Sequence, residues 1–176
     1  MNLQSTDFEF FDVPARFAQD PALLEGRWKI LQRQAHPDRF AGHGSAAQRL
    51  AMQWSVRINE AYARLKDPIK RAGYLCELHG APIDSGSTTP MPTDFLMQQM
   101  QWREDLEESK TADLKRKIVL QANEYLHEQL SKCEQTLDHD NNYLEASQPV
   151  RRLLCVQRFA SESQSQADSL GDAASV

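Results

Sequence analysis

Residues 21–40 read PALLEGRWKILQRQAHPDRF, and this stretch decides how the N-terminal half of the chain is organised. Asp20 is a good N-cap and Pro21 suits the first helical position, so the sequence predicts a helix from Pro21 to about Ala35. The apolar stripe of this helix repeats at helical spacing and comprises Leu24, Trp28, Leu31 and Ala35. Because Pro37 disfavours helical geometry at His36, the helix is expected to end there.

A second amphipathic helix is predicted after a loop of residues 41–45. It covers residues 46–66, and its expected buried stripe is Leu50, Trp54, Ile58, Ala61, Tyr62 and Leu65. The tripeptide His36-Pro37-Asp38 therefore lies between two helices. Upstream, we expect a short first helix between Pro14 and Pro21. Downstream, Asp67-Pro68 is expected to begin a further helix that Gly80 ends.

Proline and small polar residues concentrate in residues 81–93, which predicts a linker and a domain boundary. The chain then divides into residues 1–80, the linker, residues 94–160 and a tail of residues 161–176 that is expected to be disordered. Three helices are predicted in the second half, over residues 93–109, 111–137 and 141–159, with Thr93 or Asp94 capping the first and Pro149 interrupting the third. The middle helix has a nearly heptad apolar rhythm: Leu114, Ile118, Ala122, Tyr125, Leu126, Leu130, Cys133 and Leu137.

Composition favours an all-α protein and argues against several functional classes. The 176 residues include only 7 glycines, and the net charge of −5 argues against a general nucleic-acid binder. The acidic N-terminus does not read as a secretory signal and no apolar run is long enough for a membrane span, so a cytoplasmic protein is expected. Neither a glycine-rich phosphate loop nor a catalytic constellation is present, so we expect no enzymatic activity and no cofactor.

Basic residues lie beside the tripeptide, on the helix that precedes it. Arg27, Lys29 and Arg33 fall outside the apolar stripe of the preceding helix. The arrangement resembles the J-domain of DnaJ-type proteins, in which a basic helix and the adjoining loop dock onto a heat-shock ATPase. This resemblance implies a chaperone-binding set of His36, Pro37, Asp38, Arg27, Lys29 and Arg33. Proline limits the entropy that the loop loses on binding, and a basic face steers encounter with an acidic partner.

Further segments are similar to the HscB family of iron–sulfur co-chaperones, up to about residue 159. They are LQRQ at 31–34, HPDRF at 36–40, RAGYL at 71–75 with LHG at 78–80, and DFLM at 94–97 with WREDL at 102–106. The similarity implies a J-domain helical hairpin that stimulates the chaperone HscA, and a C-terminal three-helix bundle that delivers the scaffold protein IscU for cluster transfer. Some relatives carry N-terminal cysteine pairs; their absence here fits a bacterial form.

A helical wheel of the helix from Thr93 separates two apolar faces. Phe95, Trp102 and Leu106 form the expected core stripe, whereas an apolar patch points away from it and suits a protein partner. The wheel alone leaves open a wide core stripe or a contact with the first domain. The resemblance implies a scaffold-binding set of Leu96, Met97, Met100, Gln101, Glu104, Glu108 and Cys155. Three positions depart from the family pattern: Ala35 replaces an aromatic residue, Gln101 an acid and Cys155 a phenylalanine.

Two other functions remain open at this point. The chain could serve a general DnaK-type chaperone with a different client. It could instead bind metal through Cys76, Cys133, Cys155 or the scattered histidines, although the wide spacing and the lack of a C-x-x-C pair argue against a zinc site.

Overall fold

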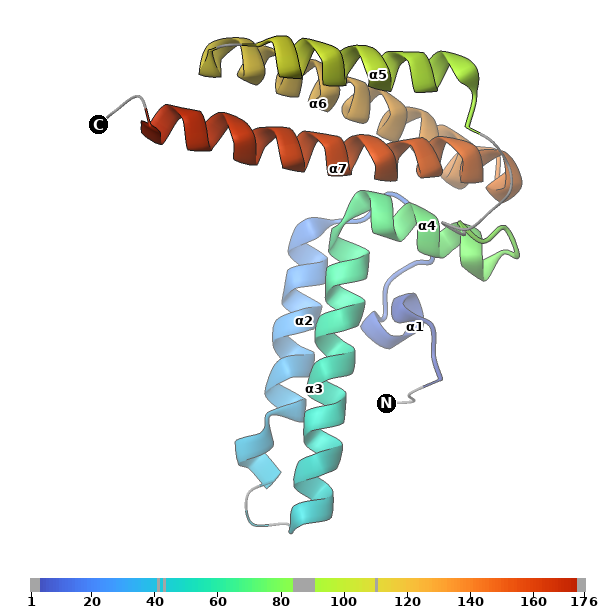
Figure 1. Ribbon diagram of the computed structural model, residues 1–176. Coiled ribbons are helices and arrows are strands. Elements are labelled where there is room, and N and C mark those ends of the chain that lie inside the picture. Colours follow the sequence, from blue (N-terminus) through green and yellow to red (C-terminus); the bar gives the residue numbers. More distant parts are fainter. Residues whose placement is uncertain (1–3, 41, 43, 84–90, 110, 174–176) are drawn as a thin grey trace. The chain divides into compact units, whose positions relative to one another are not determined.

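The computed structural model describes residues 4–40, 42, 44–83, 91–109 and 111–173, and within these the regular structure is helical, with no strand (Figure 1). The elements are α1 (Asp7–Phe11), α2 (Pro21–Ala35), the 3₁₀ turn η1 (Pro37–Phe40), α3 (Ser45–Lys66), α4 (Pro68–Leu78), α5 (Thr93–Glu108), α6 (Ala112–Glu134), the π-helical turn η2 (Gln135–His139) and α7 (Tyr143–Ala173). The predicted all-α class is confirmed. None of the described helices combines the length and the apolar character that a membrane span requires.

Contacts divide the chain into two compact units, Met1–Leu75 and Cys76–Val176. The division falls within α4, whereas the sequence predicted a first domain ending at residue 80. Residues 84–90 of the predicted linker lie outside the described residues, so the linker stays a prediction.

The first unit is built on a hairpin of α2 and α3, and α2 begins and ends where the sequence predicts. The Asp20 carboxylate accepts a hydrogen bond from the Ala22 N–H at 2.8 Å, which caps the helix. Leu24 and Ala35 are buried, and Trp28 is half-buried against Tyr62 at 5.1 Å between ring centroids. The packed face of α2 therefore matches the predicted stripe.

In α3 the predicted stripe is wrong at one end. Leu50 is 49% exposed, and the buried position is Ala51, followed by Ile58, Ala61 and Leu65. One residue corresponds to about 100° of rotation on a helix, so Leu50 and Ala51 face different surroundings.

The predicted first helix between Pro14 and Pro21 is also wrong, because α1 lies earlier, at Asp7–Phe11. The Thr6 hydroxyl accepts from the Glu9 N–H, and the Glu9 carboxylate accepts from the Thr6 N–H. This capping box fixes where the helix begins. Asp12 in a left-handed conformation, with φ of 52°, ends it.

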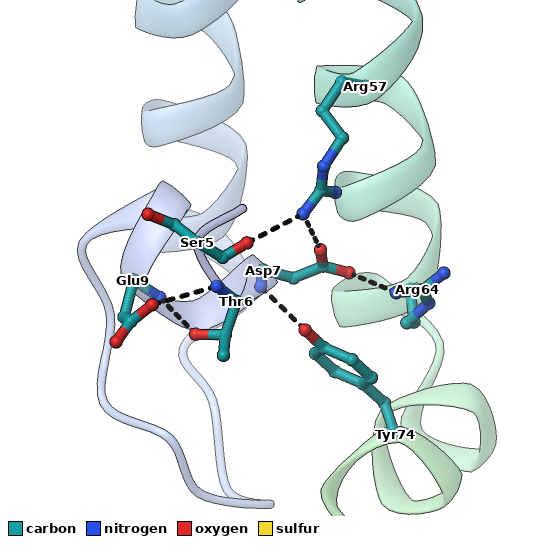
Figure 2. A network of polar contacts seen from close by, with 7 residues as sticks. All are labelled: Ser5, Thr6, Asp7, Glu9, Arg57, Arg64 and Tyr74. Atoms are coloured by element: carbon teal, nitrogen blue, oxygen red, sulfur yellow. Dashed lines mark hydrogen bonds and ion pairs between the residues drawn. The ribbon is translucent and has the colours of Figure 1, made fainter. Parts of the chain in front are cut away.

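A buried carboxylate holds α1 against the rest of its unit (Figure 2). Asp7 is 0% exposed, and its Oδ2 accepts from Arg64 Nη1 at 2.9 Å. Arg57 Nη2 lies 2.5 Å from Oδ1 as an ion pair without hydrogen-bond alignment. The Asp7 N–H donates to the Tyr74 hydroxyl at 2.9 Å, so one residue connects α1 with both α3 and α4. The neighbouring Phe10 ring stacks on Trp54, which adds apolar contact to this junction.

The second unit is a bundle of α5, α6 and α7. Its core cluster takes residues from all three helices: Phe95, Trp102, Leu106, Ile118, Ala122, Val156, Phe159 and Ala160. The predicted core stripe of α5 is confirmed, and most of the heptad-like stripe of α6 is at least half-buried. Leu114, at 47% exposure, is the exception, because it lies in the first turn of α6.

The last helix is longer and more continuous than the sequence predicts. α7 passes through Pro149 without an interruption and runs to Ala173, where a disordered tail was expected from residue 161. Serine hydroxyls in this extension find partners within the helix: Ser161, Ser163 and Ser165 each donate to the carbonyl four residues earlier, and Ser163 is buried. The polar composition that suggested disorder is therefore accommodated along a helix. Residues 174–176 lie outside the described part.

In the second unit, α6 has a side-chain N-cap and α5 has none, and this difference can be tested by substitution. The Thr111 hydroxyl accepts from the Leu114 N–H at 3.3 Å and caps α6, whereas α5 has Pro92 at its N-cap position and no side-chain cap, contrary to the expected role of Thr93 or Asp94.

Thr111→Ala is expected to lower the free energy of unfolding by about 1 kcal/mol. Urea unfolding followed by circular dichroism measures this. The matched control Thr93→Ala should stay within about 0.5 kcal/mol; equal losses would contradict the cap assignment.

Candidate functional site

His36-Pro37-Asp38 projects from the end of α2 into solvent. His36 is extended, with φ −61° and ψ 126°, as a residue before proline should be, and η1 follows. The side chains of His36 and Asp38 are 57% and 89% exposed. The Asp38 N–H donates to His36 Nδ1 at 3.3 Å, so the ring helps to order the turn. The loop therefore presents an imidazole and a carboxylate to a partner.

An open groove continues from the tripeptide along α2. Its lining residues are Trp28, Lys29, Gln32, Arg33, His36 and Arg39. The groove joins Lys29, Arg33 and His36 of the predicted set. Asn59 of α3 holds two of the lining side chains, because its Oδ1 accepts from Trp28 Nε1 at 3.0 Å and from Gln32 Nε2 at 2.6 Å. The hairpin packing thus supports the surface from below.

Sequence reasoning missed Arg39. Its Nη1 donates to the Arg33 carbonyl at 3.2 Å, which ties η1 back to the last turn of α2. The available signal was a basic residue directly after the tripeptide. Arg39 adds a third cation to Lys29 and Arg33 along the groove.

Arg27 is placed differently from the other basic residues. Its Nη2 lies 2.5 Å from the Asp12 carboxylate, and Arg27 is not among the residues that line the groove. Lys29 pairs with Glu25 one turn earlier at 2.6 Å, and this hydrogen bond with Lys29 holds the pKa of the Glu25 carboxyl below its usual value. The basic surface is therefore centred on the groove rather than spread along all of α2.

A second candidate surface lies on α5. Phe95, Trp102 and Leu106 are buried, and the other face carries Leu96, Met97 and Met100 at 44%, 65% and 61% exposure. Leu96 and Met100 are one turn apart, and Met97 adjoins them. The two-faced helix expected from the wheel is confirmed, and the reading of this patch as a wide core stripe is excluded.

Polar residues border the α5 patch on the following turns. Glu104 and Glu108 are exposed one and two turns after Met100. Gln101 Nε2 donates to Asp105 Oδ1 at 2.8 Å, so its amide is already occupied within the helix. The border is acidic mainly through the two glutamates.

The cysteines lie mostly in apolar surroundings. Cys155 is half-buried and packs against the core cluster that contains Phe95 and Trp102. Burial raises the pKa of Cys76 to about 11 and of Cys133 to about 12, which keeps both thiols protonated near neutral pH. Thiolate is the form that binds metal, and the described residues contain no cluster of three or more potential metal ligands.

Comparison with known proteins gives consistent matches. Residues 91–163 match the model of the HSCB C-terminal oligomerisation domain. The chain is 40% identical over 172 residues to a protein of Paraburkholderia xenovorans (strain LB400) called co-chaperone protein HscB homolog, covering 96% of this chain and 98% of that one. A protein of the same name from Burkholderia multivorans is 39% identical over 173 residues, covering 97% and 98%.

Solved structures share the fold. Chaperone HscB from Vibrio cholerae superposes with a TM-score of 0.82 at 30% identity, covering 94% of this chain and 99% of that chain. The human co-chaperone HscB superposes with a TM-score of 0.88, covering 94% and 84%; at 23% identity this likeness shows the fold alone.

Proposed function

Since this chain belongs to the HscB family of co-chaperones, we propose that it stimulates the ATPase of an HscA-type chaperone and delivers an IscU-type iron–sulfur scaffold protein to it. Family membership supports the coarser role, a J-type co-chaperone of iron–sulfur cluster assembly that is not itself an enzyme. The single observation that carries the finer proposal is the exposed His36 and Asp38 pair at the mouth of a basic groove.

The chemistry of this groove suits a chaperone partner. The Asp38 carboxylate, 89% exposed and 3.5 Å from His36 Nδ1, can accept a charge-assisted hydrogen bond from a cation on the partner, which is stronger than a neutral one. Lys29, Arg33 and Arg39 favour encounter with an acidic surface. We include Pro37 and Arg27 in the chaperone-binding set, Pro37 for its restricted backbone and Arg27 because the family resemblance implies it; in the free chain Arg27 pairs with Asp12.

The α5 face suits the scaffold protein. Three adjacent exposed apolar side chains offer contact area, and methionine adapts to irregular surfaces. Glu104 and Glu108 can pair with basic residues at the rim. Gln101 and Cys155 complete the proposed scaffold-binding set, although Cys155 packs mainly with the core. The proposed cellular site is the bacterial cytoplasm.

The deciding experiment is a steady-state ATPase assay of a bacterial HscA-type chaperone. Addition of this protein should raise the rate, and addition of scaffold should raise it further. A DnaK-type chaperone in parallel tests the alternative of a general co-chaperone with another client. Stimulation of the DnaK-type chaperone alone, with no effect of the scaffold, would replace the proposal by that alternative.

The α5 surface gives a separate prediction. The triple variant Leu96→Ala, Met97→Ala and Met100→Ala should weaken scaffold binding by roughly tenfold to hundredfold, because it removes apolar contact area worth about 1.4–2.8 kcal/mol. Isothermal titration calorimetry measures the affinity. The matched control replaces three exposed leucines on other helices by alanine, Leu114, Leu120 and Leu144. Equal affinity of both triple variants for the scaffold would reject the α5 assignment.

A further inference from the structure

An open pocket of about 510 Å³ lies in the second unit, where the last turns of α6, η2 and the first turns of α7 meet. Its lining residues are mostly of polar type and include Gln129, Lys132, Glu145, Gln148, Pro149 and Arg152. None of these residues belongs to the basic groove or to the exposed face of α5. The pocket is thus a feature that the proposed co-chaperone activity does not use.

Three polar side chains in its walls have no hydrogen-bond partner within the described part of the chain. Gln129 is only 8% exposed and bonds to no described residue. Gln148 Oε1 and Arg152 Nε are both buried and unpaired. Leaving buried polar atoms unsatisfied destabilises a fold, so the two such atoms at one pocket, Gln148 Oε1 and Arg152 Nε, point to a partner from outside the chain.

Arg152 is the cation available to a ligand. Its guanidinium is held 5.8 Å from the centroid of the Phe95 ring, and it forms no ion pair with any described carboxylate. Lys132, by contrast, already pairs with Glu128 at 2.7 Å. The planar guanidinium fork matches a carboxylate better than any other group in a protein does.

The pocket also contains hydrogen-bond acceptors, and an anion without an N–H group cannot satisfy them. Gln148 Oε1 needs a donor, and Pro149 has no N–H to give to the Glu145 carbonyl. The Glu145 side chain accepts from Asn142 Nδ2 at 2.7 Å and adds negative charge at the wall. A ligand that fits must combine a carboxylate for Arg152 with an N–H donor for these oxygens. The adjacent π-helical turn is a conformation that often accompanies functional sites.

We propose that this pocket binds an acidic peptide segment of a partner protein, with an Asp or Glu carboxylate on Arg152 and a main-chain N–H donated to Gln148 Oε1. A free dicarboxylate supplies no such donor, and a neutral peptide supplies no carboxylate. The proposal concerns other residues than the groove and the α5 face, so it stands or falls independently of both.

The test is a ¹⁵N NMR titration of the full chain with a capped peptide, acetyl-Ala-Asp-Glu-Ala-amide. Side-chain signals of Gln129, Gln148 and the Arg152 Nε–H should shift together. Acetyl-Ala-Asn-Gln-Ala-amide, succinate and inorganic phosphate are expected to bind at least about tenfold more weakly. If the acidic peptide shifts nothing, the pocket holds water only; if succinate or phosphate binds as well, it is a general anion site. Either result overturns the proposal.

Substitutions of Arg152 distinguish its role in peptide binding from its role in helix packing. Arg152→Gln should abolish the peptide-induced shifts at Gln129 and Gln148, and Arg152→Lys, which keeps the charge without the fork, should weaken binding at least about tenfold. Arg158→Gln, at an exposed position of the same helix, is the matched control and should bind like the unmodified chain. Unchanged affinity for the acidic peptide in both Arg152 variants would reject Arg152 as the partner of its carboxylate. If Arg152→Gln fails to fold, Arg152→Lys alone provides the test.

Discussion

Replacing His36 by glutamine is expected to remove the stimulation of the partner chaperone's ATPase, with the rate falling at least about tenfold towards the unstimulated value. The ring accepts the Asp38 N–H at 3.3 Å, and more than half of its side chain is exposed to a partner. The substitution removes both the contact surface and the bond that orders the turn. A tenfold loss corresponds to about 1.4 kcal/mol, within reach of one truncated polar contact at an interface.

The design of this experiment distinguishes docking from folding. His127→Gln, at an exposed position on α6, is the matched control and should retain full stimulation. Scaffold affinity should be unchanged in the His36 variant, because α5 belongs to the other compact unit. Full stimulation by the His36 variant would show that the tripeptide is only a helix-ending turn.

Asp7→Ala is expected to lower the free energy of unfolding of the first unit by about 3–5 kcal/mol. The carboxylate is fully buried and is the shared partner of Arg57 and Arg64. Its removal leaves two guanidinium groups facing a site without a counter-charge. Chemical unfolding followed by tryptophan fluorescence reports this unit through Trp28 and Trp54, in a background where Trp102 is replaced by phenylalanine.

Asp12→Asn is the comparison for this loss, because asparagine tolerates the left-handed backbone that Asp12 adopts at the end of α1. Asp12 pairs with Arg27 at 2.5 Å, but its side chain is 80% exposed, and exposed ion pairs contribute no more than about 1 kcal/mol. Asp7→Asn keeps the size of the side chain, so its loss in free energy of unfolding should lie between the other two losses. This variant can still be measured if the Asp7→Ala variant does not fold. A loss at Asp7 no larger than that at Asp12 would contradict the structural role of the buried network.

Local signals predicted the parts of the fold that depend on a single helix. Asp20, Pro21 and Pro37 fix the ends of α2 through backbone chemistry that acts within a few residues. The two faces of α5 followed from helical periodicity alone. The position of α1 was available in the same way, from the Thr6 and Glu9 capping box, and was missed because proline was given more weight.

Long-range contacts were beyond prediction from one sequence. The partners of Asp7 lie 57 and 67 residues away in Arg64 and Tyr74, and no local pattern connects them. Arg152 reads as a surface cation on a helical wheel, yet its environment depends on Phe95 of another helix. In the extension of α7 beyond residue 160, serine hydroxyls bond to carbonyls of their own helix, a conformation that composition does not reveal.

The network around Asp7 has a consequence for the order in which the chain matures during translation. α1 leaves the ribosome before α3 and α4, and the Tyr74 hydroxyl that accepts from the Asp7 N–H is made 67 residues later. At about 5–20 residues per second, Phe8 waits roughly 3–13 s before the Tyr74 ring on which it stacks exists. Although α1 is synthesised before α3 and α4, it is thus among the last parts of its unit to be fixed in place.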